Sequence, residues 1–201
     1  MAGVMIAIGG TVFLMTRSKE LGAVLFAIGL FAIVVNGLNL FTGQVGYIVN
    51  YSNAYLIRVL VTLVGNFIGT VFMGSILLMT RLSSSLTMKA EEMIKAKLAD
   101  SFVSIFILAF FCGILMYLAV NGYRTINDPV GKYLAVFLGV AVFILAGFEH
   151  CVANMYYFAI AKAWSWQAVC YMEIMILGNA AGAVAFSFCE KIYKQQKPQN
   201  R

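Results

Sequence analysis

The sequence has few charged residues. Asp, Glu, Lys and Arg make up only 11% of its 201 residues, whereas hydrophobic residues make up 62%, and the mean hydropathy is +0.90. A soluble domain of this size has about a quarter of its residues charged and about half of them apolar. The composition therefore excludes an ordinary soluble globular domain and favours a bundle of membrane-spanning segments.

Soft metal ligands are also scarce. The sequence has one histidine and four cysteines, and the cysteines all lie inside apolar runs without forming a Cys-x-x-Cys pair. Cysteines in such places are usually small buried hydrophobic residues. We therefore expect no metal site, no disulfide framework and no cofactor.

The positive charge does not indicate a nucleic-acid partner. The formal net charge is +6, but the basic residues lie in short segments between apolar runs and in the C-terminal tail, residues 190–201. Lys and Arg in these places are the usual anchors of a protein that crosses the membrane several times. The expected partner of the surface is a lipid bilayer, in the inner or plasma membrane of the cell.

The N-terminus begins directly with an apolar run. No basic segment precedes Met1–Met15 and no convincing cleavage site follows it, so we expect no signal peptide. The run is shorter than the ~20 residues that a helical span requires. We expect a first span whose start is trimmed.

Six apolar runs predict an all-α membrane protein with six transmembrane helices in a single domain, residues 1–201. The runs are Met1–Thr16, Leu21–Val49, Ile57–Thr80, Phe102–Asn121, Lys132–Ala161 and Trp166–Phe188. Between the third and fourth runs, Glu91 and Lys95 stand at i,i+4 spacing. This spacing predicts a short surface helix over residues 91–97.

The second and fifth runs are too long for one untilted crossing, at about 30 residues each. Each also has polar or turn-forming residues near its middle, at residues 36–44 and 147–154. Irregular backbone at membrane depth occurs only where protein buries it or a cavity hydrates it. We therefore predict that both helices are broken and that they line a pathway.

The two halves of the chain resemble each other. Gly65-Asn66 in the third run matches Gly178-Asn179 in the sixth, an offset of 113 residues. Asn39-Leu40-Phe41 matches Asn154-Met155-Tyr156, and Ala2-Gly3 matches Cys112-Gly113, at offsets of 115 and 110. The glycines four residues apart in these Gly-Asn-x-x-Gly segments indicate close helix packing.

Repeats over residues 1–80 and 102–189 hold three spans each, so they enter the membrane from opposite sides. This is the inverted-repeat plan, in which the site lies between two broken helices. Six spans also place both termini on one side. The 14 Lys and Arg residues divide equally between the two sides, so only the basic tail favours cytoplasmic termini.

His150 is the most informative single residue. The only histidine lies beside Glu149 in the middle of the fifth run. An ionisable side chain at bilayer depth costs about 2.5 kcal/mol or more and is rare unless it lines a polar path. We predict that His150 lines the pathway.

The motifs around the two breaks resemble those of the formate/nitrite transporter family. They are Leu40-Phe41-Thr42 in the second run, Phe148-Glu149-His150 followed by Ala153-Asn154-Met155 in the fifth, and Gly178-Asn179 with Gly182 in the sixth. The resemblance covers nearly the whole chain. It implies an aquaporin-like helical fold, a homopentamer with one pore per subunit, and transport of small monovalent anions of weak acids such as formate, nitrite or hydrosulfide.

The resemblance also implies site residues. Phe26, Leu30 and Phe143 would form a cytoplasmic-side constriction, and Leu40, Phe41, Met116 and His150 would line the opposite one. Thr42 would bond near His150, Asn154 belongs to the histidine motif, and Lys97 falls where the family keeps a vestibule lysine. The chain departs from the family at Gly113, where an asparagine partner of the histidine is common, and at the bulkier Met116. These differences favour the hydrosulfide-channel branch and leave the cargo open.

The chemistry of these residues agrees with the implied roles. Two apolar rings dehydrate a cargo, and dehydration is costly for a bare anion but not for its neutral acid. Lys97 at the mouth would concentrate anions. His150, whose unperturbed pKa is near 6.5, would exchange a proton with the cargo or gate the anion.

Three other classes of protein fit less well. An aquaporin-like neutral-solute channel needs paired Asn-Pro-Ala loops, but the only prolines, Pro129 and Pro198, lie outside the runs. An ion-coupled secondary transporter usually has more intramembrane carboxylates than Glu149 and Glu173. No enzyme is expected, since neighbouring helical residues such as His150 and Cys151 point in different directions and form no nucleophile–base pair.

Overall fold

The computed structural model describes residues 1–196, and these residues form helices and loops without any strand. The helices are α1 (Ala2–Met15), α2 (Lys19–Val35), α3 (Phe41–Gln44), the 3₁₀ helix η1 (Val45–Asn50), α4 (Asn53–Leu77), α5 (Ser83–Leu98), α6 (Phe102–Thr125), α7 (Pro129–Ala146), α8 (Cys151–Ile160) and α9 (Trp166–Gln196). Four of them, α4, α6, α7 and α9, are long and apolar enough to cross a membrane, and α1 and α8 are shorter apolar helices.

The two long apolar runs are broken, as predicted. The second run becomes α2, an irregular segment, α3 and η1, and the fifth becomes α7 and α8. Gly147 ends α7 with a φ of 75°, a left-handed backbone conformation that favours glycine. The polar centres of both runs therefore mark the breaks.

Two boundaries differ from the sequence prediction. The predicted surface helix over 91–97 is the C-terminal part of α5, whose Leu86, Ala90 and Ile94 are buried at i,i+4 spacing. The helix is thus longer than predicted, and it packs one face on the protein while the other face is exposed. The basic tail begins inside α9, which continues to Gln196, and residues 197–201 lie outside the described part of the chain.

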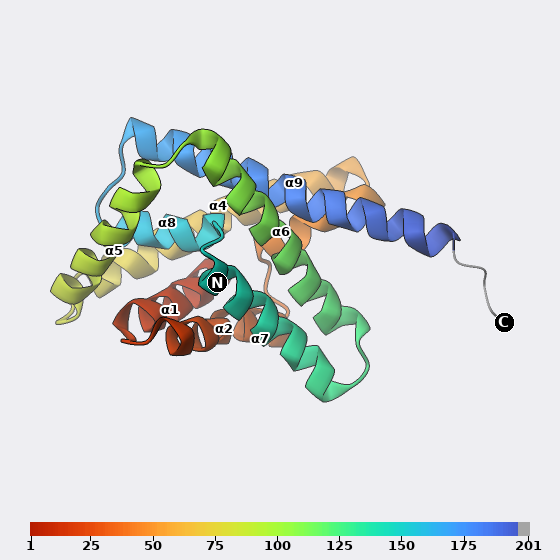
Figure 1. The fold of residues 1–201 in the computed structure, drawn as a ribbon, viewed down its shortest axis with the longest axis horizontal. Coiled ribbons are helices and arrows are strands. Elements are labelled where there is room, and N and C mark those ends of the chain that lie inside the picture. Colours follow the sequence, from red (N-terminus) through yellow and green to blue (C-terminus); the bar gives the residue numbers. More distant parts are fainter. Residues whose placement is uncertain (197–201) are drawn as a thin grey trace.

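The helices form two inverted repeats that exchange their half-helices. Helix α1 packs against α2 and α4, and α6 packs in the same way against α7 and α9 (Figure 1). The short helix α8 of the second repeat packs against α4 of the first, while η1 of the first packs against α9 of the second. Helices α2 and α7 meet where the two repeats face each other.

Two glycines allow matching close helix contacts, one within each repeat. A Cβ atom at Gly3 would lie 2.2 Å from the carbonyl oxygen of Asn66, and one at Gly113 would lie 2.1 Å from that of Asn179. The predicted equivalence of Gly3 with Gly113 is therefore confirmed. Because a side chain at position 113 would point into α9, the absence of an asparagine there is explained by helix packing.

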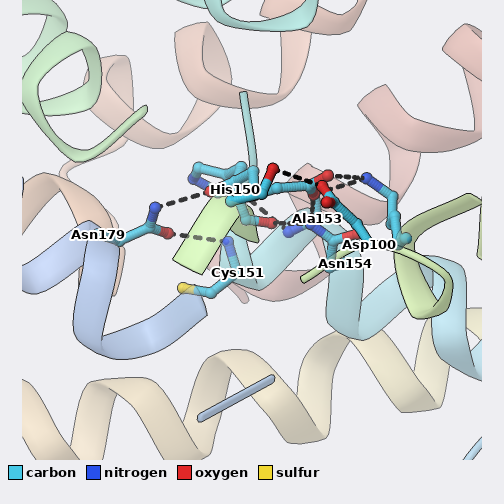
Figure 2. Close-up of polar contacts among 9 residues, drawn as sticks. Asp100, His150, Cys151, Ala153, Asn154 and Asn179 are labelled. Carbon is cyan, nitrogen blue, oxygen red and sulfur yellow. Dashed lines mark hydrogen bonds and ion pairs between the residues drawn. The ribbon is translucent and has the colours of Figure 1, made fainter. Parts of the chain in front are cut away.

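Two buried asparagines hold the two breaks. In the first, the Phe41 N–H donates to Asn66 Oδ1 over 2.9 Å, and Asn66 Nδ2 donates to the Asn39 carbonyl over 3.0 Å. In the second, the Cys151 N–H donates to Asn179 Oδ1 over 2.8 Å. Figure 2 shows Asn179 facing this break, where its Nδ2 donates to the Glu149 carbonyl over 2.7 Å.

These matched bonds correct the sequence alignment of the repeats. They make Asn39-Leu40-Phe41 equivalent to Glu149-His150-Cys151 rather than to Asn154-Met155-Tyr156. The Gly-Asn-x-x-Gly segments therefore do more than allow close helix packing, since their asparagines also bond the backbone at the breaks. A broken helix leaves backbone groups without intrahelical partners, and the asparagines supply those partners.

Large apolar side chains cover the outer faces of several helices. On α4, for example, Ile57, Val61, Val64, Ile68 and Phe72 are all exposed. A monomeric soluble protein rarely exposes a continuous apolar surface of this kind. The outer faces thus suit lipid or neighbouring protein, in agreement with a protein that crosses the membrane several times.

We expect Asn179→Leu and Asn66→Leu to destabilise the protein strongly. Each substitution leaves one buried N–H and one buried carbonyl unpaired, at about 1–3 kcal/mol per group. The thermal unfolding midpoint in detergent measures the effect. Asn53→Leu, at an exposed position at the start of α4, is the matched control. An Asn179→Leu protein that unfolds with the wild type would contradict the role of the asparagine.

Candidate functional site

A cavity opens on one side of the second break. It has a volume of ≈ 460 Å³ and is named here the Lys97 vestibule. Its lining residues include Lys19, Lys97, Asp100, Phe143, Glu149, His150, Ala153, Asn154 and Tyr157. Side chains from α2, α5, α7 and α8 thus meet around one hollow.

A second cavity opens on the opposite side of the molecule, beside the first break. It has a volume of ≈ 220 Å³ and is named here the Arg58 vestibule. Its lining residues include Asn39, Leu40, Gln44, Arg58, Tyr123 and Arg124. Each of the two breaks therefore faces its own cavity.

The predicted pathway residues lie in and between these cavities. His150 and Phe143 line the Lys97 vestibule, and Leu40 lines the Arg58 vestibule. The others lie in the packed core between them and line neither cavity: Phe26, Leu30, Phe41, Thr42 and Met116. The aromatic rings follow one another, since Phe26 lies 6.0 Å from Phe143 and Phe143 stacks on His150 at 5.4 Å.

The side expected for Phe143 and the side expected for the termini do not agree. The last described turns of α9 lie beside η1 on the Arg58 side, since Lys191 Nζ donates to the Val49 carbonyl. Phe143 lies on the Lys97 side. A cytoplasmic constriction at Phe143 and cytoplasmic termini therefore exclude each other.

His150 both caps α8 and contacts the other repeat. Its Nδ1 accepts a hydrogen bond from the Ala153 N–H over 3.0 Å, and its Nε2 lies 2.8 Å from Thr42 Oγ1. Because Nδ1 is an acceptor, a neutral imidazole carries its proton on Nε2 and donates it to Thr42. A proton on Nδ1 would face the Ala153 N–H and break the cap, so this geometry suits the neutral ring.

Lys97 is neutralised by a buried carboxylate. Its Nζ donates to Glu149 Oε1 over 2.7 Å and forms an ion pair with Oε2. Asn154 Nδ2 donates to the same carboxylate over 2.8 Å (Figure 2). Lys97 thus lies in the vestibule, as expected, but its charge is compensated locally rather than free to attract anions.

Other cations remain without a carboxylate partner. The ion pairs among residues 1–196 are Lys97–Glu149 and Lys194–Glu190. Arg58 donates instead to Asn39 Oδ1, Lys19 donates to the Leu145 carbonyl, and Arg124 lies over the Tyr47 ring. Arg58 and Arg124 line the Arg58 vestibule and Lys19 lines the Lys97 vestibule. Cations without a carboxylate partner in a concave site raise the local concentration of anions. This applies to the Arg58 vestibule, whereas Asp100 and Glu149 balance Lys19 and Lys97 in the Lys97 vestibule.

Several of these features were not predicted from the sequence. The pairing of Lys97 with Glu149 joins residues 52 positions apart, and no local pattern indicates it. Tyr157 was also missed, although its position seven residues after His150 places both on one helix face. That spacing was the signal available for Tyr157.

The sequence of this chain is similar to those of known transporters. The family model described as "Formate/nitrite transporter" matches residues 1–193. The formate-nitrite transporter of Plasmodium knowlesi is 28% identical and aligns with 84% of this chain and 60% of its own length. The formate channel FocA of Haemophilus influenzae is 27% identical over 69% of this chain and 52% of its own. The chain thus spans roughly half to three fifths of these relatives.

Solved structures have the same fold. A pentameric formate channel with formate bound matches with a TM-score of 0.83 at 23% identity, over 98% of this chain and 94% of that one. An ion channel of the FNT family matches with a TM-score of 0.81 at 25% identity, over 98% and 88%. These matches confirm the predicted aquaporin-like fold. Because the family model covers nearly the whole chain, the protein belongs to the formate/nitrite transporter family.

Proposed function

We propose that this chain forms a membrane channel for small monovalent anions of weak acids. The observation that carries the proposal is the pair of vestibules, one of them lined by Arg58 and Arg124, separated by a packed apolar barrier in which Thr42 and His150 make a polar contact. Relatives named as transporters and channels support transport rather than catalysis.

The barrier favours a cargo that can lose its charge. Arg58 and Arg124 attract anions to one mouth, and the other has Lys19 and Lys97 balanced by Asp100 and Glu149. Entry into the apolar core removes water, which is costly for a bare anion and much less so for its neutral acid. Weak acids are the cargo class that can meet both demands, since they reach the vestibules as anions, take one proton from the solvent there, cross as neutral molecules and release the proton on the other side.

Thr42 is the group that meets the cargo inside the barrier. His150 Nε2 donates to Thr42 Oγ1, which leaves the threonine hydroxyl proton available to a passing oxygen. The half-helix α8 also begins at His150, so the positive end of its dipole points at the same region. In this proposal His150 stays neutral and positions Thr42.

The assembly and orientation of the protein follow from the same proposal. The matching solved formate channel is described as pentameric, and we propose a homopentamer with one pore per subunit. The exposed apolar faces of α4, α6 and α7 supply surface for lipid and for neighbouring subunits. With cytoplasmic termini, the Arg58 vestibule faces the cytoplasm and the Lys97 vestibule faces outward.

Flux in proteoliposomes tests the proposed function. We expect the purified protein to carry formate, nitrite or hydrosulfide faster than empty liposomes do. Thr42→Val should lower this flux by about threefold to tenfold, because it removes one hydrogen bond worth about 0.5–1.5 kcal/mol. Thr70→Val is the control, since Thr70 is equally buried but bonds to its own helix. No weak-acid flux above that of empty liposomes would refute the channel function.

The protonation state of His150 can be tested separately. We expect His150→Asn to retain the increase of formate uptake with falling pH, because that increase reflects the protonated fraction of the cargo. Asparagine is also a good N-cap, whereas His150→Ala should lose about 0.5–2 kcal/mol of helix stability. Uptake measured between about pH 5 and about pH 8 gives the profile. A flat profile in His150→Asn would mean that the imidazole itself titrates during transport.

Because Lys97 and Glu149 form a buried ion pair, we expect that the loss of stability from removing one charge depends on whether the other is present. Lys97→Met should cost about 3–5 kcal/mol, because it leaves a buried carboxylate without its cation. The double variant Lys97→Met/Glu149→Gln should be more stable than Lys97→Met, since it removes both charges. Thermal unfolding of the wild type, both single variants and the double variant completes the cycle. Additive losses would show that the two charges do not depend on each other.

A further inference from the structure

The amide of Asn154 presents a buried acceptor without a partner. Its Nδ2 donates to Glu149 Oε2 over 2.8 Å and to the His150 carbonyl over 3.0 Å. Both partners are acceptors, so a flipped amide would bring Oδ1 against two oxygens. The orientation is thereby fixed, and Oδ1 accepts no hydrogen bond within the described part of the chain. The residue is only 2% exposed and lines the Lys97 vestibule.

Tyr157 adds a second polar group to the same wall. It follows Asn154 by three residues on α8, so the two share a helix face, and both line the Lys97 vestibule. Its ring is buried, and its hydroxyl makes no hydrogen bond to any of residues 1–196. The wall therefore offers one fixed acceptor and one hydroxyl that can donate or accept.

No net charge accompanies these two groups. The nearby Glu149 carboxylate is engaged by Lys97 on both oxygens and by Asn154 on one. A ligand on this wall thus meets a neutral acceptor and a hydroxyl rather than a cation. A bare formate or nitrite anion has no hydrogen to give to Asn154 Oδ1, and leaving that oxygen unpaired is unfavourable.

We infer that Asn154 and Tyr157 form a docking subsite for the neutral, protonated form of a small oxyacid. The acid O–H donates to Asn154 Oδ1, and its second oxygen accepts from the Tyr157 hydroxyl. The inference rests on the proposed function and narrows its cargo to oxyacids. Hydrogen sulfide fits the subsite poorly, because its S–H groups are weak donors and its sulfur is a weak acceptor. Asn154 lies one helical turn from His150, so a cargo that enters from the Lys97 vestibule meets the subsite first and His150 afterwards.

Competition by uncharged analogues tests the subsite in the intact protein. Formamide resembles formic acid and has both a donor and an acceptor, but it does not ionise in this range. Methyl formate keeps the acceptor and lacks the donor. We expect formamide to inhibit formate uptake into proteoliposomes at a fixed pH, and methyl formate to inhibit at least about threefold less well.

The variant Tyr157→Phe tests whether formamide inhibits by binding at Tyr157. Tyr157→Phe should weaken inhibition by formamide by about threefold to tenfold, the value of one neutral hydrogen bond. Tyr156→Phe is the matched control, because this neighbour on α8 is buried and its hydroxyl pairs with Thr11.

The outcomes separate this inference from the proposed function. Wild-type formate uptake that formamide and methyl formate inhibit equally would refute the subsite, and would indicate that Asn154 Oδ1 binds only water. Equal formamide inhibition in Tyr157→Phe and wild type would remove Tyr157 from it. If Tyr157→Phe does not fold, the comparison of the two analogues on the wild type still decides. Absence of any formate uptake would instead contradict the channel function.

Discussion

The pairing of two buried asparagines with two interrupted helices is the constraint on which the rest of the structure depends. Asn66 and Asn179 satisfy the backbone groups that the breaks expose. Without them, irregular backbone at membrane depth would have neither water nor an intrahelical partner. With them, Leu40 and His150 occupy equivalent places at the two breaks, and Thr42 reaches His150 across the contact between repeats.

The polar groups of the pathway are arranged so that few of them are free. Lys97 and Glu149 compensate each other, and His150 uses both ring nitrogens in bonds within the protein. What remains for a cargo is a threonine hydroxyl, an amide oxygen and a tyrosine hydroxyl. In the proposed channel, neutral donors and acceptors between the two vestibules would select a cargo by hydrogen bonding and hydration rather than by net charge.

Much of this architecture could be predicted from the sequence because membrane depth makes polar residues conspicuous. The breaks near Asn39 and His150 were visible for that reason. The internal repeat related the two segments but aligned Asn39 with Asn154 instead of Glu149. The sequence did not reveal the task of Asn66 and Asn179, since Gly-Asn-x-x-Gly also fits plain helix packing. The Lys97–Glu149 pair was missed because it joins distant segments. The meaning of Gly113 depends on how closely α6 approaches α9, which is a tertiary property.

The exchange of half-helices between the repeats also bears on how the protein is made. Helix α8 rests on α4, and η1 rests on α9, so neither repeat contains a complete surface for its own short helix. A nascent chain that has emerged only as far as α5 therefore holds its first break without the Thr42–His150 contact and without the helix against which η1 packs. The second break likewise lacks the Asn179 bonds to Glu149 and Cys151 until α9 is in place, so both breaks depend on the last helix of the chain.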